Sequence, residues 1–358
     1  MINALKRPLL LLLAACLCSA AVAGRVDDLY KGREAVAEQS PATLRRGAAS
    51  ALEQVFVRVS GQGQLPQSSA LSEALASPEP FLTRYSYRRE NTDGEERLWL
   101  DMKFSPRQVN AVLQSAGLPV WSANRPTVLL WLVVDTPEGR SFLGSGSHPA
   151  LEKALQDAVA RRGLALQLPL FDLIDAGNMS AQALWQMPEG RVREASQRYA
   201  PPFILMGRAS QLSTGQWLAS WALLDEQSGE RFDTQSQQDS GFLAAAVDRV
   251  ADVQARRYAV NSVAGAGGRT LIHVSGLTHF DDYAQMVSYL ESLAVIEHAN
   301  AAWAFGEELV LELVLKDDMD KVERYLQLDG RLRRATEGIG RSRSPLATQG
   351  NYIWQGQP

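Results

Sequence analysis

The chain has 358 residues, a hydrophobic fraction of 46%, 21% charged residues and a formal net charge of -4 at pH 7. This length exceeds one ordinary hydrophobic core and predicts two or three domains. The composition excludes an intrinsically disordered chain, and the slightly acidic balance argues against nucleic acid as a partner.

The first 23 residues have the pattern of a secretory signal peptide. A basic pair precedes an apolar run that ends at about Cys18, and small residues up to Ala23 suit cleavage before Gly24. The segment "LAAC", which ends at Cys16, is also an acceptable lipoprotein box, but apolar residues follow it where a lipoprotein begins a polar tether. We expect export to the periplasm as a soluble protein. The alternative is a lipoprotein anchored through Cys16, the one case in which we expect a membrane contact.

The cysteines are confined to this segment. Since Cys16 and Cys18 are the only two, a chain cleaved after Ala23 has no disulfide and no thiolate nucleophile or metal ligand. The later apolar run "PTVLLWLVVD" has about half of the ~20 residues that a spanning helix needs, so we expect a buried strand there.

Residues 24–122 predict a small α+β domain. Pro41 opens a run of apolar residues at helical spacing. Two alternating segments flank "NTDG", whose Asp93-Gly94 pair is typical of a hairpin turn. The expected elements are a helix from Pro41, a short helix over 71–76, a hairpin over 81–104 and a helix from Ser105 to Gly117.

Residues 127–262 predict a mixed-sheet α/β domain. The continuous apolar run "TVLLWLVVD" is typical of a strand that is covered on both faces. The expected elements after it are a helix from about His148 to Arg162, a strand and loop in "LALQLPLFDLID", short helices, a strand in "PFILMGRAS", a hairpin from Trp217 and a closing amphipathic helix ending near Val260.

The rest of the chain predicts a third domain and a tail. A glycine-rich linker over 264–268 leads to residues 269–328, whose order β-α-β-β-α suits a ferredoxin-like sandwich. Residues 330–358 have no sustained apolar period, so we expect a disordered tail with a basic run of arginines.

The segment between the first two domains, "LPVWSANRP", raises the question of how they join. We expect Val120 and Trp121 to pack the end of the first domain onto the second, with "TVLLWLVVD" as the central strand beneath them. The sequence therefore predicts a seam between domains at this position.

Candidate ligand-binding residues follow two strands of the middle domain. "GSGSH", with Ser145, Ser147 and His148, resembles a glycine-rich anion cradle, although it matches no phosphate-loop motif and also suits a helix cap. Asp172 and Asp175 in "DLID" are a candidate carboxylate pair, for which a cap is the alternative.

The remaining candidates are a pair of tryptophans, the histidines and an acidic group. Trp217 and Trp221 point to the same side of one strand, so they form an interaction surface if that side is exposed and a core if the closing helix covers it. The four histidines are far apart and share no metal-binding spacing, and the acidic group at 317–320 lacks the pattern of a calcium loop. We expect no metal, no cofactor and no catalytic residue.

Several blocks of the chain resemble a known family. "LEQVFVRVSGQGQL", "RGLALQLPLFDLID", "ASQRYAPPFILMGRAS" and "WLASWALLD" are similar to an uncharacterised family of exported bacterial proteins, domain of unknown function number two thousand and sixty-six. The resemblance implies an envelope location and brings no ligand or catalytic residue with it.

Two functions fit these observations. The first is a non-enzymatic periplasmic accessory protein that binds another envelope protein through a sheet edge or groove. The alternative is a small-molecule-binding protein or hydrolase. Its pocket would lie at the carboxyl ends of the middle-domain strands, where Asp135, Ser145 to His148 and Asp172 to Asp175 would converge.

Overall fold

The computed structural model describes residues 24–26, 28–92, 95–226, 228–237, 240–261, 267–335 and 344–356. The expected signal peptide with Cys16 and Cys18, and the expected turn at Asp93-Gly94, lie outside these residues. Within the described part of the chain, no helix is both long and apolar enough to cross a bilayer.

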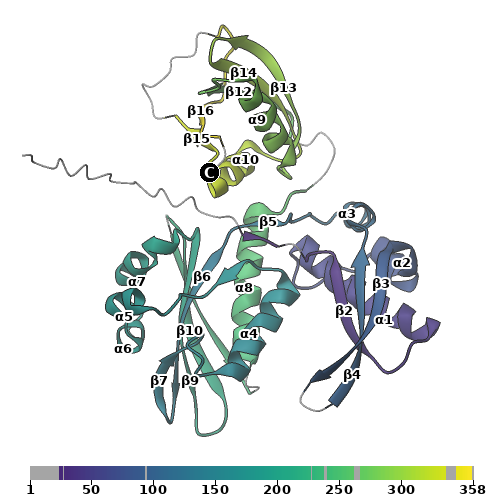
Figure 1. Ribbon diagram of the computed structural model, residues 1–358, viewed down its shortest axis with the longest axis vertical. Coiled ribbons are helices and arrows are strands. Elements are labelled where there is room, and N and C mark those ends of the chain that lie inside the picture. The colour runs from purple at the N-terminus through teal and green to yellow at the C-terminus, as the bar shows by residue number, and fades with distance from the viewer. Residues whose placement is uncertain are drawn as a thin grey trace, which may run out of the picture.

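The fold is multidomain α+β, as the sequence predicts (Figure 1). In the N-terminal domain, helices pack on a three-stranded antiparallel sheet of order β2-β4-β3. Helix α1 begins where Ser40 accepts a hydrogen bond from Thr43 N, and it ends at Gly61 with a left-handed φ of 72°. The elements are β1 (Gly24–Arg25), β2 (Lys31–Val36), α1 (Pro41–Ser60), α2 (Ser69–Ala76), the 3-10 helix η1 (Glu79–Phe81), β3 (Leu82–Thr92), β4 (Glu95–Phe104) and α3 (Pro106–Ser115).

The middle domain has a mixed sheet of order β11-β10-β9-β6-β7, and β8 pairs with the same edge of β6 as β7 does. Strands β8 and β9 run parallel to β6, and the other pairs are antiparallel. The elements are β5 (Asn124–Arg125), β6 (Val128–Thr136), β7 (Gly139–Phe142), α4 (Pro149–Arg162), β8 (Leu166–Gln167), α5 (Leu173–Asn178), α6 (Ala181–Leu184), α7 (Glu189–Ser196), η2 (Gln197–Tyr199), β9 (Phe203–Gln211), β10 (Trp217–Leu224), β11 (Gly229–Ser236) and α8 (Gly241–Tyr258).

Strand β6 is covered on both faces, which confirms the reading of its apolar run. Alternate side chains such as Val128 and Leu130 join the core beneath α4 and α8. Those between them, such as Leu129 and Trp131, join a second core beneath α6 and α7. A strand whose two faces are both buried needs apolar residues at every position, and this is why no alternation is visible in the sequence.

The C-terminal domain has the predicted β-α-β-β-α order, and its sheet has the order β13-β14-β12-β16-β15. The elements are β12 (Arg269–Ser275), α9 (Phe280–Ser292), β13 (Ile296–Phe305), β14 (Glu308–Leu315), α10 (Met319–Asp329), β15 (Leu332–Arg334) and β16 (Gly350–Trp354).

The prediction of a disordered tail is wrong over the last two strands. Strand β16 pairs in parallel with β12, and its Tyr352 and Trp354 enter the core. Two apolar residues in alternation give too short a pattern to be recognised in a sequence. The strand forms because β12 offers it an open edge and apolar neighbours.

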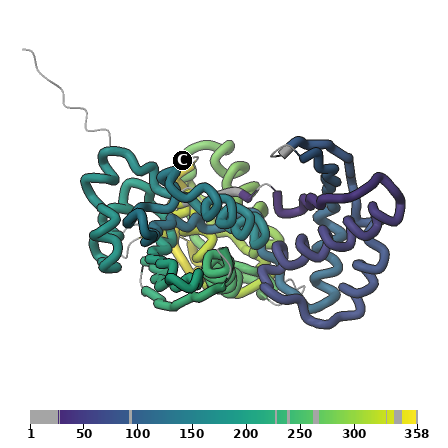
Figure 2. The backbone as a smooth tube through the Cα atoms, turned by 90° about the horizontal axis from the view of Figure 1, so that it is seen from below, coloured from purple at the N-terminus to yellow at the C-terminus, as the bar shows by residue number. Residues whose placement is uncertain are grey.

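The expected seam is confirmed. Val120 forms an antiparallel bridge with Val260, which follows α8. The amide of Trp121 donates to Val59 O of α1 over 2.7 Å, while its fully buried ring joins the core of the middle domain. Seen from below in Figure 2, the N-terminal domain lies beside the middle domain, and this linking segment joins the two.

A buried arginine stabilises the seam. The side chain of Arg125 is fully buried and stacks on the Trp121 ring at 3.7 Å. Its nitrogens donate to the carbonyls of Arg58 in α1 and of Arg162 and Gly163 at the end of α4, and also to those of Trp121 and Ser122. The last carbonyls of a helix lack intrahelical partners and carry partial negative charge, so one guanidinium satisfies two helix ends.

The C-terminal domain contacts the end of α8 by the same chemistry. The hydroxyl of Tyr325 donates to Tyr258 O over 2.8 Å, and Lys321 Nζ donates to Ala259 O over 2.9 Å. Helix α10 therefore caps α8 with side chains, and in Figure 1 the C-terminal domain stands above the end of α8.

We expect Trp121→Ala to lower the free energy of unfolding by about 3–5 kcal/mol, because a large buried ring is lost at the seam. Thermal unfolding should then show the N-terminal domain melting separately. A single transition at the wild-type temperature would mean that Trp121 does not couple the domains.

We expect Arg125→Met to cost about 3–5 kcal/mol in urea unfolding, because several buried carbonyls lose their donor at once. Arg161→Met is the matched control, since Arg161 is 40% exposed and pairs with Asp248 at the surface. The control should cost about 1 kcal/mol or less. Equal midpoints for the two variants would show that Arg125 is not the stabilising group.

Candidate functional site

The two predicted ligand loops of the middle domain do meet. Strands β7 and β8 share one edge of β6, so the loops that follow them approach each other. A Cβ added to Gly144 would lie 2.7 Å from the side chain of Leu168 and 3.1 Å from that of Phe171. Phe142 and Phe171 stack with their ring centroids 5.0 Å apart. Apolar side chains therefore fill the space where the sequence hypothesis puts a pocket.

The glycine-rich loop binds the carboxylate of Glu152, a residue of the same chain. Gly144 N and Gly146 N donate to Glu152 Oε1 over 3.1 and 3.2 Å. Ser145 Oγ donates to Phe142 O and lies 3.1 Å from Ser147 Oγ. Because a carboxylate of α4 satisfies the loop amides, these residues act as a helix-start motif.

His148 begins α4 and makes one contact of chemical interest. Its Nε2 lies 2.8 Å from Ser141 Oγ, which is the arrangement of a nucleophile and a base. Within the described residues, no carboxylate hydrogen-bonds to the other ring nitrogen to orient it. Sequence reasoning did not find Ser141, since it lies seven residues before His148 and outside the glycine-rich motif.

Asp135 does not join these loops. It pairs with Arg140 at 3.3 Å, and the Arg140 guanidinium lies 4.0 Å above the Trp185 ring. Beside Trp185, a groove of about 600 Å³ lies over the carboxyl end of β9, with Arg208 and Asp233 at its sides. The carboxyl ends of the parallel strands thus carry a groove, but its lining residues differ from those predicted.

Asp172 and Asp175 lie close together and share one cation. Asp172 caps α5 by accepting from Ile174 N and Asp175 N, and it forms a bidentate ion pair with Arg198 at 2.8 and 3.0 Å. The carboxylate of Asp175 is buried and accepts from Phe171 N and from the Tyr199 hydroxyl. Every carboxylate oxygen of the pair therefore has a donor within the chain, and the cap alternative fits these contacts.

The contacts within this cluster shift the pKa values of Asp172, Arg198 and Tyr199. The hydrogen bond from Arg198 lowers the pKa of Asp172 to about 2, and the carboxylate raises the pKa of Arg198 in return. Burial, followed by the hydrogen bond to Asp175, raises the pKa of the Tyr199 hydroxyl. Asp172 therefore stays ionised beside the charged Arg198 guanidinium, and the Tyr199 phenol stays neutral, across the physiological range.

This polar cluster supports an exposed apolar surface. Leu170 is 67% exposed, Leu173 92% and Ile174 58%. Between them Phe171 turns inward with a left-handed φ of 52° and packs against Trp131. We name the three exposed residues Leu170, Leu173 and Ile174 the aliphatic knob.

The interaction surface predicted at Trp217 and Trp221 is wrong, and the core alternative is right. Both side chains are at most 4% exposed, and Trp217 stacks on Phe242 of α8 with the ring centroids 4.9 Å apart. The closing helix covers this side of β10.

The other polar candidates have local partners. His273 lies in β12, His298 in β13 and His279 before α9. Asp317 pairs with Lys321, and Asp318 caps α10. Among the described residues, no three histidine, cysteine, aspartate or glutamate side chains gather as metal ligands would.

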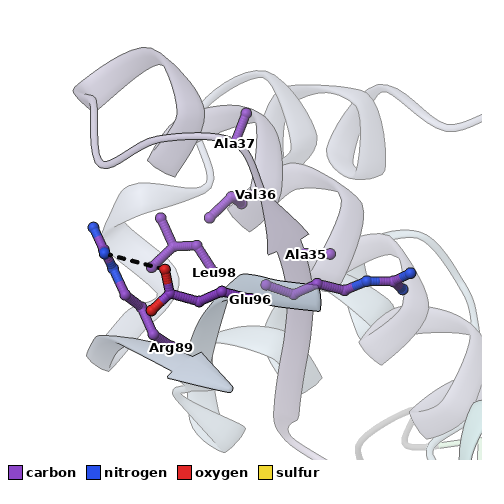
Figure 3. A pocket seen from close by; sticks show the side chains of 7 residues that line it. Ala35, Val36, Ala37, Arg89, Glu96 and Leu98 are labelled. Carbon is purple, nitrogen blue, oxygen red and sulfur yellow. Dashed lines mark hydrogen bonds and ion pairs between the residues drawn. The ribbon is translucent and has the colours of Figure 1, made fainter. Parts of the chain in front are cut away.

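Two further hollows have charged rims. Figure 3 shows one of about 440 Å³ at the end of β2, where Arg89 pairs with Glu96 beside Leu98 and Val36. Another, of about 770 Å³, lies between α10 and the start of β9, and there Arg257 pairs with Asp225 at 2.6 Å. In the first hollow most rim charges form ion pairs, and in the second the central Arg257 and Asp225 pair with each other. Neither hollow therefore presents a convergent set of reactive groups.

Comparison with known proteins identifies one domain. A family model for a domain of unknown function (DUF8605) matches residues 23–122, which include the N-terminal α+β domain. The resemblance to family number two thousand and sixty-six is therefore wrong, because the matching family is a different one and covers only the first domain. No curated protein matches the chain.

We expect Arg198→Gln to raise the pKa of Asp172 from about 2 towards its ordinary value of 3.8. The folded-state pKa is depressed, so the ion pair stabilises α5 fully above about pH 4 and is lost as the pH falls through about 2. Carboxyl-carbon NMR shifts would measure the titration. Arg231→Gln, which breaks a surface pair with Glu189, is the control and should leave Asp172 unchanged. An unaltered titration in Arg198→Gln would contradict the assignment.

Proposed function

We propose that this protein is a non-enzymatic accessory protein of the cell envelope that binds a partner protein through the aliphatic knob. One observation carries the proposal: three large aliphatic side chains, one of them 92% exposed, stand together on a segment with its own polar support. Single exposed leucines are common on protein surfaces, whereas adjacent ones mark contact sites.

The support beneath the knob favours a binding role. Asp172 fixes the start of α5, and Asp175 holds both Phe171 N and Tyr199. A segment ordered in this way before binding loses little conformational entropy when a partner covers it. The backbone at Phe171 has a left-handed φ of 52°; its ring packs inward against Trp131, while Leu170 and Leu173 remain exposed.

The charges around the knob favour a protein over a lipid surface. Segments that insert into membranes carry cations for the headgroups beside their apolar side chains. Here Arg198 is bound to Asp172 and Asp175, and Arg191 donates to Asn178 O over 2.8 Å. With its nearby cations engaged, the knob fits an apolar pocket on another protein.

The envelope location rests on the N-terminal pattern alone. A basic pair, an apolar run and small residues before Gly24 support export through a cleavable signal peptide, with lipidation of Cys16 as the alternative. Mass spectrometry of the mature N-terminus separates the two.

The hydrolase alternative rests on the contact between Ser141 and His148. With no orienting carboxylate on the histidine, we expect Ser141 to remain unlabelled by a fluorophosphonate probe. Labelling that disappears in Ser141→Ala would instead support the hydrolase.

We expect a photo-crosslinking amino acid at position 173 to give a protein adduct in intact cells, and Ile174→Ser to abolish it. Leu212, which is 41% exposed elsewhere in the middle domain, is the matched control position and should give no such adduct. Leu173→Ser should leave the melting temperature unchanged, because the side chain is already in water. Identical adducts from positions 173 and 212, no adduct from 173, or adducts with lipid alone would refute the proposal.

A further inference from the structure

The N-terminal sheet has a charged outward face. Its helices pack on the other face, where Leu100, Met102 and Phe104 enter the core. Side chains alternate along a strand and cross-strand partners share a face, so the register defines the outward set. This set contains six cations and three carboxylates: Lys31, Arg33, Arg84, Arg88, Arg97 and Lys103, with Glu90, Glu95 and Asp101. We name these six cations the cationic face.

The cations are not spread evenly over this face. Lys103 on β4 lies directly opposite Lys31 on one side and Arg84 on the other, so three cations form one row across the sheet. Like charges that face each other across strands destabilise a sheet. No neutralising carboxylate lies within the row itself, and such a costly arrangement points to a role in binding.

Four of the six cations have acidic partners, and two cations of the row do not. Asp101 pairs with Arg33 and Arg88, and Glu90 pairs with Arg33. Arg97 pairs with Glu95, and Lys31 pairs with Asp28 outside the sheet. Among the described residues, Arg84 and Lys103 have no acidic partner, and both are exposed. Arg84 and Lys103 therefore give the row two uncompensated positive charges that are open to solvent.

We propose that the cationic face binds the phosphate-rich surface of an anionic lipid bilayer. An uncovered sheet face with exposed cations complements a plane of phosphate groups, and each cation near such a surface strengthens binding about fivefold. This contact does not depend on the aliphatic knob, which belongs to another domain.

The aromatic residues of the domain favour a bilayer over single-stranded nucleic acid. Such nucleic acids stack their bases on free aromatic rings. The one aromatic residue in the outward set, Trp99, is already covered by the Arg33 guanidinium at 4.4 Å. Tyr85 and Tyr87 belong to the opposite face of the sheet. The cationic face thus offers charge without a free stacking surface.

The test is co-sedimentation of the exported protein with vesicles of phosphatidylcholine, alone or with about one third phosphatidylglycerol. We expect binding to the anionic vesicles only, weakening as salt is raised. The double variant Arg84→Gln with Lys103→Gln should reduce binding about 25-fold, the product of two fivefold effects. Its melting temperature should stay level or rise, because like-charge repulsion is relieved.

The control removes two cations from the helical side of the same domain. Arg45→Gln with Arg46→Gln on α1 has the same change in net charge and should alter vesicle binding less than about twofold. Equal binding to neutral vesicles, an equal loss in the control, no binding at all, or tighter binding to a single-stranded oligonucleotide would each overturn the proposal.

Discussion

The guanidinium group of Arg125 is the constraint on which the arrangement of the first two domains depends. It is fully buried, and burial lowers its pKa to about 9, so it remains charged at neutral pH. A buried charge is tolerated only where hydrogen bonds replace its water. Here the acceptors are main-chain carbonyls from the end of α1, the linking segment and the end of α4. The cation is therefore satisfied only when all three are in place. Gly163 belongs to this requirement, because a Cβ there would lie 2.9 Å from Arg125 Nη1.

The same chemistry extends to the third domain. Helix α8 ends beneath Lys321, Arg324 and Tyr325, which donate to its last carbonyls, and the Tyr325 hydroxyl also lies 3.3 Å from Ser122 Oγ in the linking segment. Side chains from neighbouring segments thus cap the ends of α1, α4 and α8 around one junction. The aliphatic knob and the cationic face lie on different domains, and this junction sets how the two surfaces are presented together.

The polar groups of the middle domain mainly bind one another and hold the segment that exposes the aliphatic knob. Glu152 occupies the glycine-rich loop, and Arg198 and Tyr199 occupy the carboxylates of Asp172 and Asp175. Once these groups are engaged, what remains exposed beside them is apolar. A binding role follows more directly from such a surface than a reaction does, because a reaction requires polar groups that are free to contact a substrate.

The sequence by itself determined the elements whose signal is local. The helix from Pro41, the strand at "TVLLWLVVD" and the seam at Trp121 could be predicted because capping residues, unbroken apolar runs and chain breaks act over a few residues. Only the tertiary structure decided which polar groups find partners. It placed Glu152 in the glycine-rich loop and Arg198 on Asp172, aligned three cations across the N-terminal sheet and brought β16 beside β12. Each of these contacts depends either on residues far apart in the chain or on strand register. A local sequence pattern encodes neither long-range pairing nor register.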